Sequence, residues 1–156
     1  EKIVTSTTIY VGKAGNLLEA KQENCCVMRI NNPILTNTDM LKIKNMKVEG
    51  FKAVTVPITY YKSAPLDRAM DRLFVEVDRA HRAGANILIL SDRGVDENHV
   101  AIPSLLAVSA VHQHLVKTKK RTSLAIILES GEPREVHHFA TLLGYGACWH
   151  STRSMS

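Results

Sequence analysis

Two short, almost wholly apolar runs, residues 86–90 and 124–128, constrain the fold of this chain more than any other feature of its sequence. Strands that are apolar on both sides are typical of sheets that are buried on both faces. Residues 104–116, which lie between them, have the length and apolar composition of a helix. A strand, a helix and a second strand form a right-handed crossover in a parallel sheet. We therefore predict an α/β fold with a parallel sheet and helices on both of its faces.

The clearest helix lies between Pro65, which suits a first turn, and Gly84, which suits a helix end. Its larger apolar residues recur at intervals of four and three, the spacing of one helix face. This face, which we expect to pack against the sheet, consists of Leu66, Met70, Leu73, Val77 and Ala80.

Strands and helices alternate through the rest of residues 33–147, which we predict to be a single α/β domain. Helices are predicted over 37–46 and 133–143, and a strand over 51–60. Pro57 has no amide hydrogen to donate, so this strand belongs at a sheet edge or a bulge. Residues 1–32 are strand-like and rich in turn signals, which predicts an N-terminal β-rich arm.

Composition and charge exclude several classes of partner. No apolar run approaches the roughly 18 to 20 residues that cross a bilayer, so we expect no membrane contact. The start of the chain has no secretory-leader pattern, which favours a cytoplasmic protein. The net charge of +5 would suit an acidic partner, but the densest basic cluster falls where the helix over 104–116 should end. Aromatic residues are not interleaved with basic ones, so we expect no nucleic-acid partner.

Polar and charged residues follow both apolar strands directly, at what should be the carboxyl edge of the sheet, where α/β proteins place ligand sites. Carboxylates, a guanidinium and an imidazole could serve acid–base chemistry, but a polar loop with a glycine turn serves equally as an interface. The residue types leave three roles open: a structural or interface loop, a free-standing enzyme and a small-ligand or regulatory module. The candidate residues are Asp92, Arg93, Asp96, Glu97, His99, Glu129 and Ser130.

Other motifs give no firm site. His112 and His114 are about 200° apart on a helix and cannot share a metal ion. Glu135 and His138 have the ExxH spacing of di-iron bundles, but that chemistry needs a second such motif. Nucleophile-elbow and phosphate-loop patterns are absent, and the three cysteines have no metal-ligand spacing. We therefore expect no catalytic, cofactor-binding or metal-binding residue in this chain.

Longer strings carry a specific resemblance to a known family. The strings are GNLLE at 15–19, NPILTNTDMLKIK at 32–44, ILILSDRGVDENHVAIPSLLAVSAVHQHLVKTKKRT at 87–122 and ESGEPREVHHFATLLGYGA at 129–147. Through them the chain closely resembles the central domain of the large chain of bacterial-type glutamate synthase, from about Ile3 to Ala147.

The resemblance implies a function for a larger protein. Glutamate synthase makes two glutamates from glutamine and 2-oxoglutarate, with an amidotransferase domain that releases ammonia and an FMN domain that uses it. The family's central domain joins these two, forms part of the wall of the ammonia channel and has no catalytic centre. The implied partners are therefore the amidotransferase and FMN domains of the same chain. FMN and an iron–sulfur cluster are expected in the parent enzyme and not in this fragment.

The resemblance also assigns roles to individual positions. We expect the charged edge from Asp92 to His99, with Glu129 and Ser130, to meet neighbouring domains. We expect Ile34, Leu35, Thr36 and Asn37 to contribute to the channel, although Thr36 or Asn37 could simply cap a helix. Residues 148–156 depart from the family, which suggests a cloning boundary or a shifted reading frame. The natural partner of the strand over 124–128 could then be absent.

Overall fold

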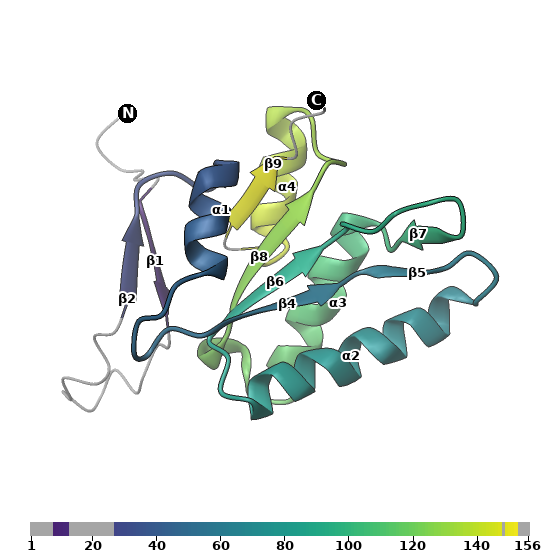
Figure 1. Cartoon of the computed structure of the whole chain (residues 1–156), viewed down its shortest axis with the longest axis horizontal. Helices are drawn as coiled ribbons and strands as arrows, with labels where there is room; N and C mark the ends of the chain where they lie inside the picture. Colours follow the sequence, from purple (N-terminus) through teal and green to yellow (C-terminus); the bar gives the residue numbers. More distant parts are fainter. Residues whose placement is uncertain (1–7, 13–26, 148, 153–156) are drawn as a thin grey trace.

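A five-stranded parallel sheet forms the centre of the protein (Figure 1). The computed structural model describes residues 8–12, 27–147 and 149–152. The strands lie in the order β3-β9-β8-β6-β4, and each pairs in parallel with its neighbours. They are β3 (Ile34–Leu35), β4 (Ala53–Pro57), β6 (Ile87–Ser91), β8 (Ala125–Ser130) and β9 (Trp149–Thr152).

Helices cover both faces of the sheet. Figure 1 shows α1 (Asn37–Lys44) in front of it and α3 (Ser104–Lys117) and α4 (Val136–Gly144) behind it. The connection from β3 to β4 crosses the sheet in the direction opposite to the later connections, so right-handed crossovers place α1 on the opposite face. Together with α2 (Leu66–Arg82), these helices confirm the predicted α/β fold.

The alternation of side chains along the central strands divides the core into two layers. Leu88, Leu90 and Leu128 belong to the larger apolar cluster, which also contains buried residues of α2, α3 and α4. Ile89 and Ile127 point the other way, into a smaller cluster that Met40 and Ile43 of α1 complete. Every residue of β6 and β8 is buried, which confirms the prediction from the two apolar runs.

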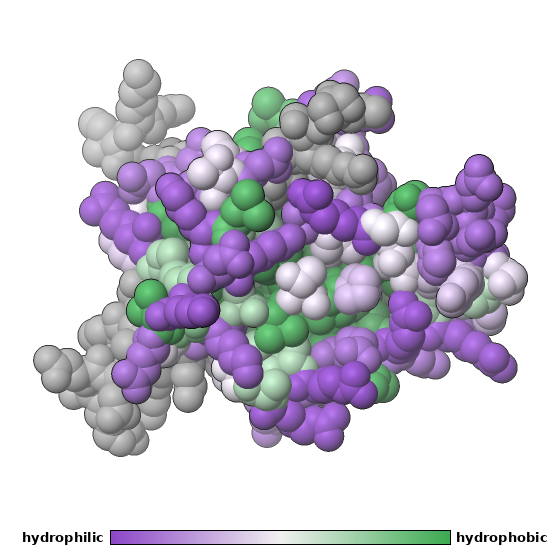
Figure 2. All heavy atoms as spheres, viewed as in Figure 1, coloured by the Kyte–Doolittle hydropathy of each residue, from purple (hydrophilic) through white to green (hydrophobic). Residues whose placement is uncertain are grey.

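The face that carries α1 is only partly covered by helix. Figure 2 shows hydrophobic atoms in the middle of this face, between hydrophilic side chains. An antiparallel hairpin of β1 (Ile9–Gly12) and β2 (Val27–Ile30) lies beside α1, in the segment predicted as a β-rich arm. Met28 and Ile30 pack against the smaller cluster, so the hairpin extends the core on this side.

The predicted strand over 51–60 is in fact two strands. β4 ends at Pro57, and β5 (Thr59–Tyr61) pairs with β7 (His99–Ala101) in a separate antiparallel ribbon. Ile58 lies between β4 and β5, is fully buried, and bonds through its backbone to Ser91 and Ile102. The position of β4 at the edge of the sheet is the one that Pro57 predicted.

Two further expectations need correction. The last helix begins at Val136 instead of residue 133, because the backbone of Glu135 is extended and this residue is the N-cap. Leu66 is 37% exposed at the first turn of α2, and Ala69 is buried in its place. β8 pairs in parallel with β9, which lies in the segment 148–156 that departs from the family.

Candidate functional site

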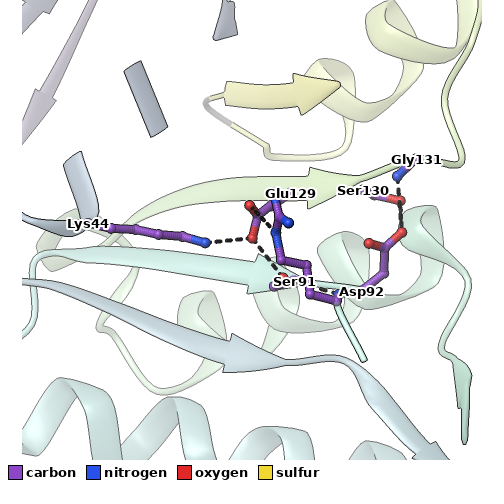
Figure 3. A network of polar contacts seen from close by, with 7 residues as sticks. Lys44, Ser91, Asp92, Glu129, Ser130 and Gly131 are labelled. Atoms are coloured by element: carbon purple, nitrogen blue, oxygen red, sulfur yellow. Dashed lines mark hydrogen bonds and ion pairs between the residues drawn. The ribbon is translucent and has the colours of Figure 1, made fainter. Parts of the chain in front are cut away.

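Four of the predicted site residues, Asp92, Arg93, Glu129 and Ser130, lie in two separate polar clusters at the carboxyl edge of the sheet (Figure 3). Ser91 and Glu129 lie two residues after Ile89 and Ile127 on β6 and β8, so their side chains are on the same face of the sheet, the one that carries α1. Asp92 and Ser130, each one residue later, turn to the opposite face. The two carboxylates therefore do not form one paired acid–base site.

Glu129 is the centre of the first cluster. Its side chain is 3% exposed, and it binds Lys44 Nζ at 2.8 Å and Arg93 Nε at 2.7 Å. The Ser91 hydroxyl donates to Glu129 at 2.7 Å. Burial alone would raise the pKa of Glu129, but the hydrogen bonds from Lys44, Arg93 and Ser91 outweigh it and lower this pKa below its ordinary value.

Asp92 is the centre of the second cluster. Its Oδ2 accepts from the Ser130 hydroxyl at 2.8 Å and from the Gly131 amide at 3.0 Å. The Ser130 hydroxyl also lies 3.0 Å from that of Ser104, at the start of α3. Asp92 Oδ1 is buried and has no hydrogen-bond partner within the part of the chain that the structure describes. Most buried polar atoms in folded proteins have a hydrogen-bond partner, so this oxygen is a position at which a donor from outside the described residues could bind.

Asp96 and His99 belong to neither cluster. Asp96 Oδ1 accepts from the amides of Asn98 and His99, and His99 Nδ1 lies 2.9 Å from it. The hydrogen bond from the His99 ring, followed by that from the Asn98 amide, lowers the pKa of Asp96. The His99 ring also contacts Tyr61, at a centroid separation of 4.3 Å. These residues form the turn that begins β7, and Glu97 is exposed beside them.

The enzyme alternative required Asp92, Arg93 and His99 to converge on one enclosed pocket. The structure places Arg93 with Glu129, Asp92 with Ser130, and His99 on the ribbon of β5 and β7. The hollow beside His99 is lined by Tyr61, Lys62, Ser63, Glu97 and Asn98 as well, and it contains neither Asp92 nor Arg93. The predicted acid–base residues are therefore not assembled in one place.

The four channel candidates lie at the end of β3 and the start of α1. Leu35 is a core residue, 3% exposed, whereas Ile34 is 40% exposed. Thr36 caps α1, because its hydroxyl accepts from the Asp39 amide and the Asp39 carboxylate accepts from the Thr36 amide. Asn37 is the first residue of the helix and is exposed. The capping role foreseen for this segment therefore falls to Thr36.

We expect Thr36→Ala to lower the free energy of unfolding by about 1 kcal/mol, because two helix-start amide bonds depend on this capping box. Thr36→Ser keeps the hydroxyl and should change stability by only a few tenths of a kcal/mol. Urea unfolding of both variants measures the difference. Equal losses for the two variants would exclude the hydroxyl as the cause.

Sequence reasoning missed four members of the two clusters: Lys44, Ser91, Ser104 and Glu132. Ser91 carried a usable signal, because it is the last residue of an apolar strand and shares the face of Ile89. Lys44 carried none, because it reaches Glu129 from 85 residues away. Ser104 and Glu132 meet across the start of α3, which only the packing of β8 beside β6 brings about.

Among the described residues, no group of three or more His, Cys, Asp and Glu side chains is arranged to hold a metal ion. Glu129, the most buried carboxylate of the edge, already binds two cationic side chains. At this edge, therefore, the carboxylate of Glu129 is not free to bind a metal ion. Within the same residues, no helix is both long and apolar enough to cross a bilayer.

Comparison with known proteins gives one consistent family. A family model described as the glutamate synthase central domain matches residues 1–149. The chain is 40% identical over 147 residues to the glutamate synthase [NADPH] large chain of Bacillus subtilis, covering 94% of this chain and 10% of that one. It is 41% identical over 152 residues to glutamate synthase [NADH] of Schizosaccharomyces pombe, covering 94% and 7%. It is 35% identical over 153 residues to the chloroplastic ferredoxin-dependent glutamate synthase of Spinacia oleracea, covering 94% and 9%.

Proposed function

Because this chain belongs to the glutamate synthase central domain family, we propose that it is the non-catalytic domain that connects the amidotransferase and FMN domains of a glutamate synthase. The observation that carries this proposal is the length of the domain compared with the length of its relatives. The family model spans residues 1–149, whereas the chain spans only 7–10% of the length of the relatives it matches. A unit of this size in much longer chains suits a connecting role.

The parent protein, in this proposal, makes L-glutamate from L-glutamine and 2-oxoglutarate, and its FMN and iron–sulfur cluster are held by other domains. The chemistry of Glu129 supports a structural role for the present domain. A carboxylate that accepts bonds from Lys44, Arg93 and Ser91 is held in its ionised form and is a poor proton acceptor. Its bonds instead join α1, the end of β6 and the loop that follows β6.

The same edge supplies the surface for neighbouring domains. The loop from Arg93 to Asn98 is exposed, and Val95 within it is 52% exposed. The buried oxygen of Asp92 that has no donor among the described residues supports a partner at this edge. The free-standing ligand module remains the alternative, and a ligand-dependent rise in melting temperature of this chain alone would favour it.

For the ammonia channel we propose the exposed start of α1, and Asn37 is the position that tests it. In the complete parent enzyme we expect Asn37→Trp to leave glutamine hydrolysis intact and to lower glutamine-dependent glutamate formation several-fold. A bulky ring at a channel wall blocks the passage of ammonia but not its release. The measurement compares both rates and the ammonia that escapes into solution.

Val75→Trp is the matched control, because Val75 is 55% exposed on α2, which packs on the other face of the sheet. It should leave the two rates coupled. Asn37 is preferred to Thr36 for this test, since a change at Thr36 also removes the cap of α1. Unchanged coupling in Asn37→Trp would remove the start of α1 from the channel.

The choice of electron donor, we propose, lies outside this domain. Relatives named for NADPH, NADH and ferredoxin resemble the chain at 40%, 41% and 35% identity, over nearly the same 94% of its length. If this domain selected the electron donor, its sequence identity to the three groups of relatives would be expected to differ more.

A further inference from the structure

A hollow of about 230 Å³ lies between the start of α3 and α4, on the face opposite Glu129. Buried Ser104, Pro133 and Leu142 line it. Leu105 and the exposed side chains of Glu132 and His138 also line it. The hollow is open to solvent and combines apolar walls with polar groups.

The hydrogen bonds of Glu132 and His138 leave one acceptor and one donor at this hollow. Glu132 Oε2 accepts from the Ser104 amide at 2.8 Å, and Oε1 has no hydrogen-bond partner among the described residues. His138 Nδ1 accepts from the Arg134 amide at 3.2 Å, so the proton of the neutral ring is on Nε2. A group that donates to a carboxylate and accepts from an imidazole N–H would therefore complement both side chains.

The size of the hollow limits its occupant. A volume of 230 Å³ is below the roughly 300 to 1,000 Å³ of small-molecule and cofactor sites, and it suits one large side chain. A phenol ring would contact the apolar walls, and its hydroxyl both donates and accepts. Tyrosine also carries this combination at a low cost in conformational entropy, which is why it is frequent at interfaces.

The surroundings indicate a protein partner. Leu105 is 39% exposed beside the hollow, and Val136, at the first turn of α4, is 85% exposed. The relatives continue far beyond this domain, since the chain covers only 7–10% of their length. We propose that the hollow receives a tyrosine side chain from an adjoining domain of the same parent polypeptide. This inference rests on the proposed connecting role and names one contact through which the connection is made.

Photo-crosslinking in the complete parent protein tests the proposal. A benzophenone amino acid replaces Leu105, at the hollow, and in a control protein it replaces Val116, which is 48% exposed near the other end of the same helix. We expect position 105 to crosslink to a tyrosine-containing peptide of the same polypeptide from outside residues 1–156. Position 116 should not reach that peptide. Mass spectrometry of the digested monomer identifies the linked peptides.

Two variants of His138 test the hydrogen bond. His138→Leu removes the donor and should lower the crosslinking yield about fivefold, whereas His138→Gln can still donate and should retain most of it. The proposal is overturned by a crosslink to another protein or a second copy, by a linked peptide without tyrosine, or by no crosslink. The coupling test at Asn37 is independent, so normal coupling with an intramolecular crosslink would reject the channel and keep the docking contact.

Discussion

Glu129→Ala should be the most damaging single change at the carboxyl edge, with a loss of about 2 to 3 kcal/mol in the free energy of unfolding at pH 7. Removing one partner from a buried ion pair costs roughly 3 to 5 kcal/mol when the remaining charge stays buried. Here the partners left behind are Lys44, 25% exposed, and Arg93, 54% exposed, which can regain water. Denaturant unfolding of the chain and its variant measures the difference.

Glu76→Ala is the matched control, because it removes an exposed glutamate that pairs with Arg79 at 3.1 Å on α2. Such surface pairs contribute about 0 to 1 kcal/mol, so the change should be small. If the two variants lost the same stability, the network around Glu129 would have no special role.

The contribution of Glu129 should also depend on pH in a defined direction. Its pKa is lower in the folded chain than the ordinary value of 4.5. The folded state therefore binds the proton less readily than the unfolded state, so the stabilisation is fully present above pH 4.5. It is lost as the pH falls through the lower folded pKa. The difference in free energy of unfolding between the original chain and Glu129→Ala should therefore become smaller over that acid range.

The sequence predicts the fold well because its central elements have unambiguous patterns. An apolar run such as Ile87 to Leu90 has no polar face, so it can only be a strand buried on both sides or part of a buried helix, and its length decides. The ribbon of β5 and β7 has no such pattern. Its strands have three residues each, and Ile58, which separates β4 from β5, looks in the sequence like one more strand residue.

The sequence predicts where the polar residues of the edge lie, but not which of them contact one another. Strand ends place Asp92 and Glu129 at one edge of the sheet, and the structure places them there. Side chains alternate between the two faces of the sheet along each strand, so Glu129 lies on the same face as Ile127, two residues earlier. The cation that completes this cluster, Lys44, comes from a distant helix, and no local pattern indicates it.

Gly146 is constrained by its backbone conformation and by a close neighbour, neither of which can be recognised from the sequence. Its φ is +115°, a conformation that side chains rarely adopt, and a Cβ built there would lie 2.6 Å from His112 Nδ1. His112 cannot easily move, because its Nδ1 accepts from Arg121 Nε at 2.9 Å. Burial and then the charge of Arg121 lower the pKa of His112, which keeps this nitrogen free to accept. Arg121 also donates to the Gly146 carbonyl at 3.0 Å, which closes the arrangement.

We therefore expect Gly146→Ala to destabilise the chain by about 2 to 4 kcal/mol, from backbone strain of about 1 to 3 kcal/mol together with the clash at His112. Gly144→Ala, two residues earlier in the same segment, is the control. Its Cβ would meet nothing within 4 Å and its φ is not positive, so it should be neutral or stabilising by up to about 1 kcal/mol.

A double-mutant cycle with His112→Ala separates the two causes, because the shorter side chain removes most of the clash and leaves the strain. The pair should be less destabilised than the sum of the single variants. Strict additivity would mean that the His112 ring is not the obstacle. Equal stability of Gly144→Ala and Gly146→Ala would contradict the left-handed backbone at Gly146 itself.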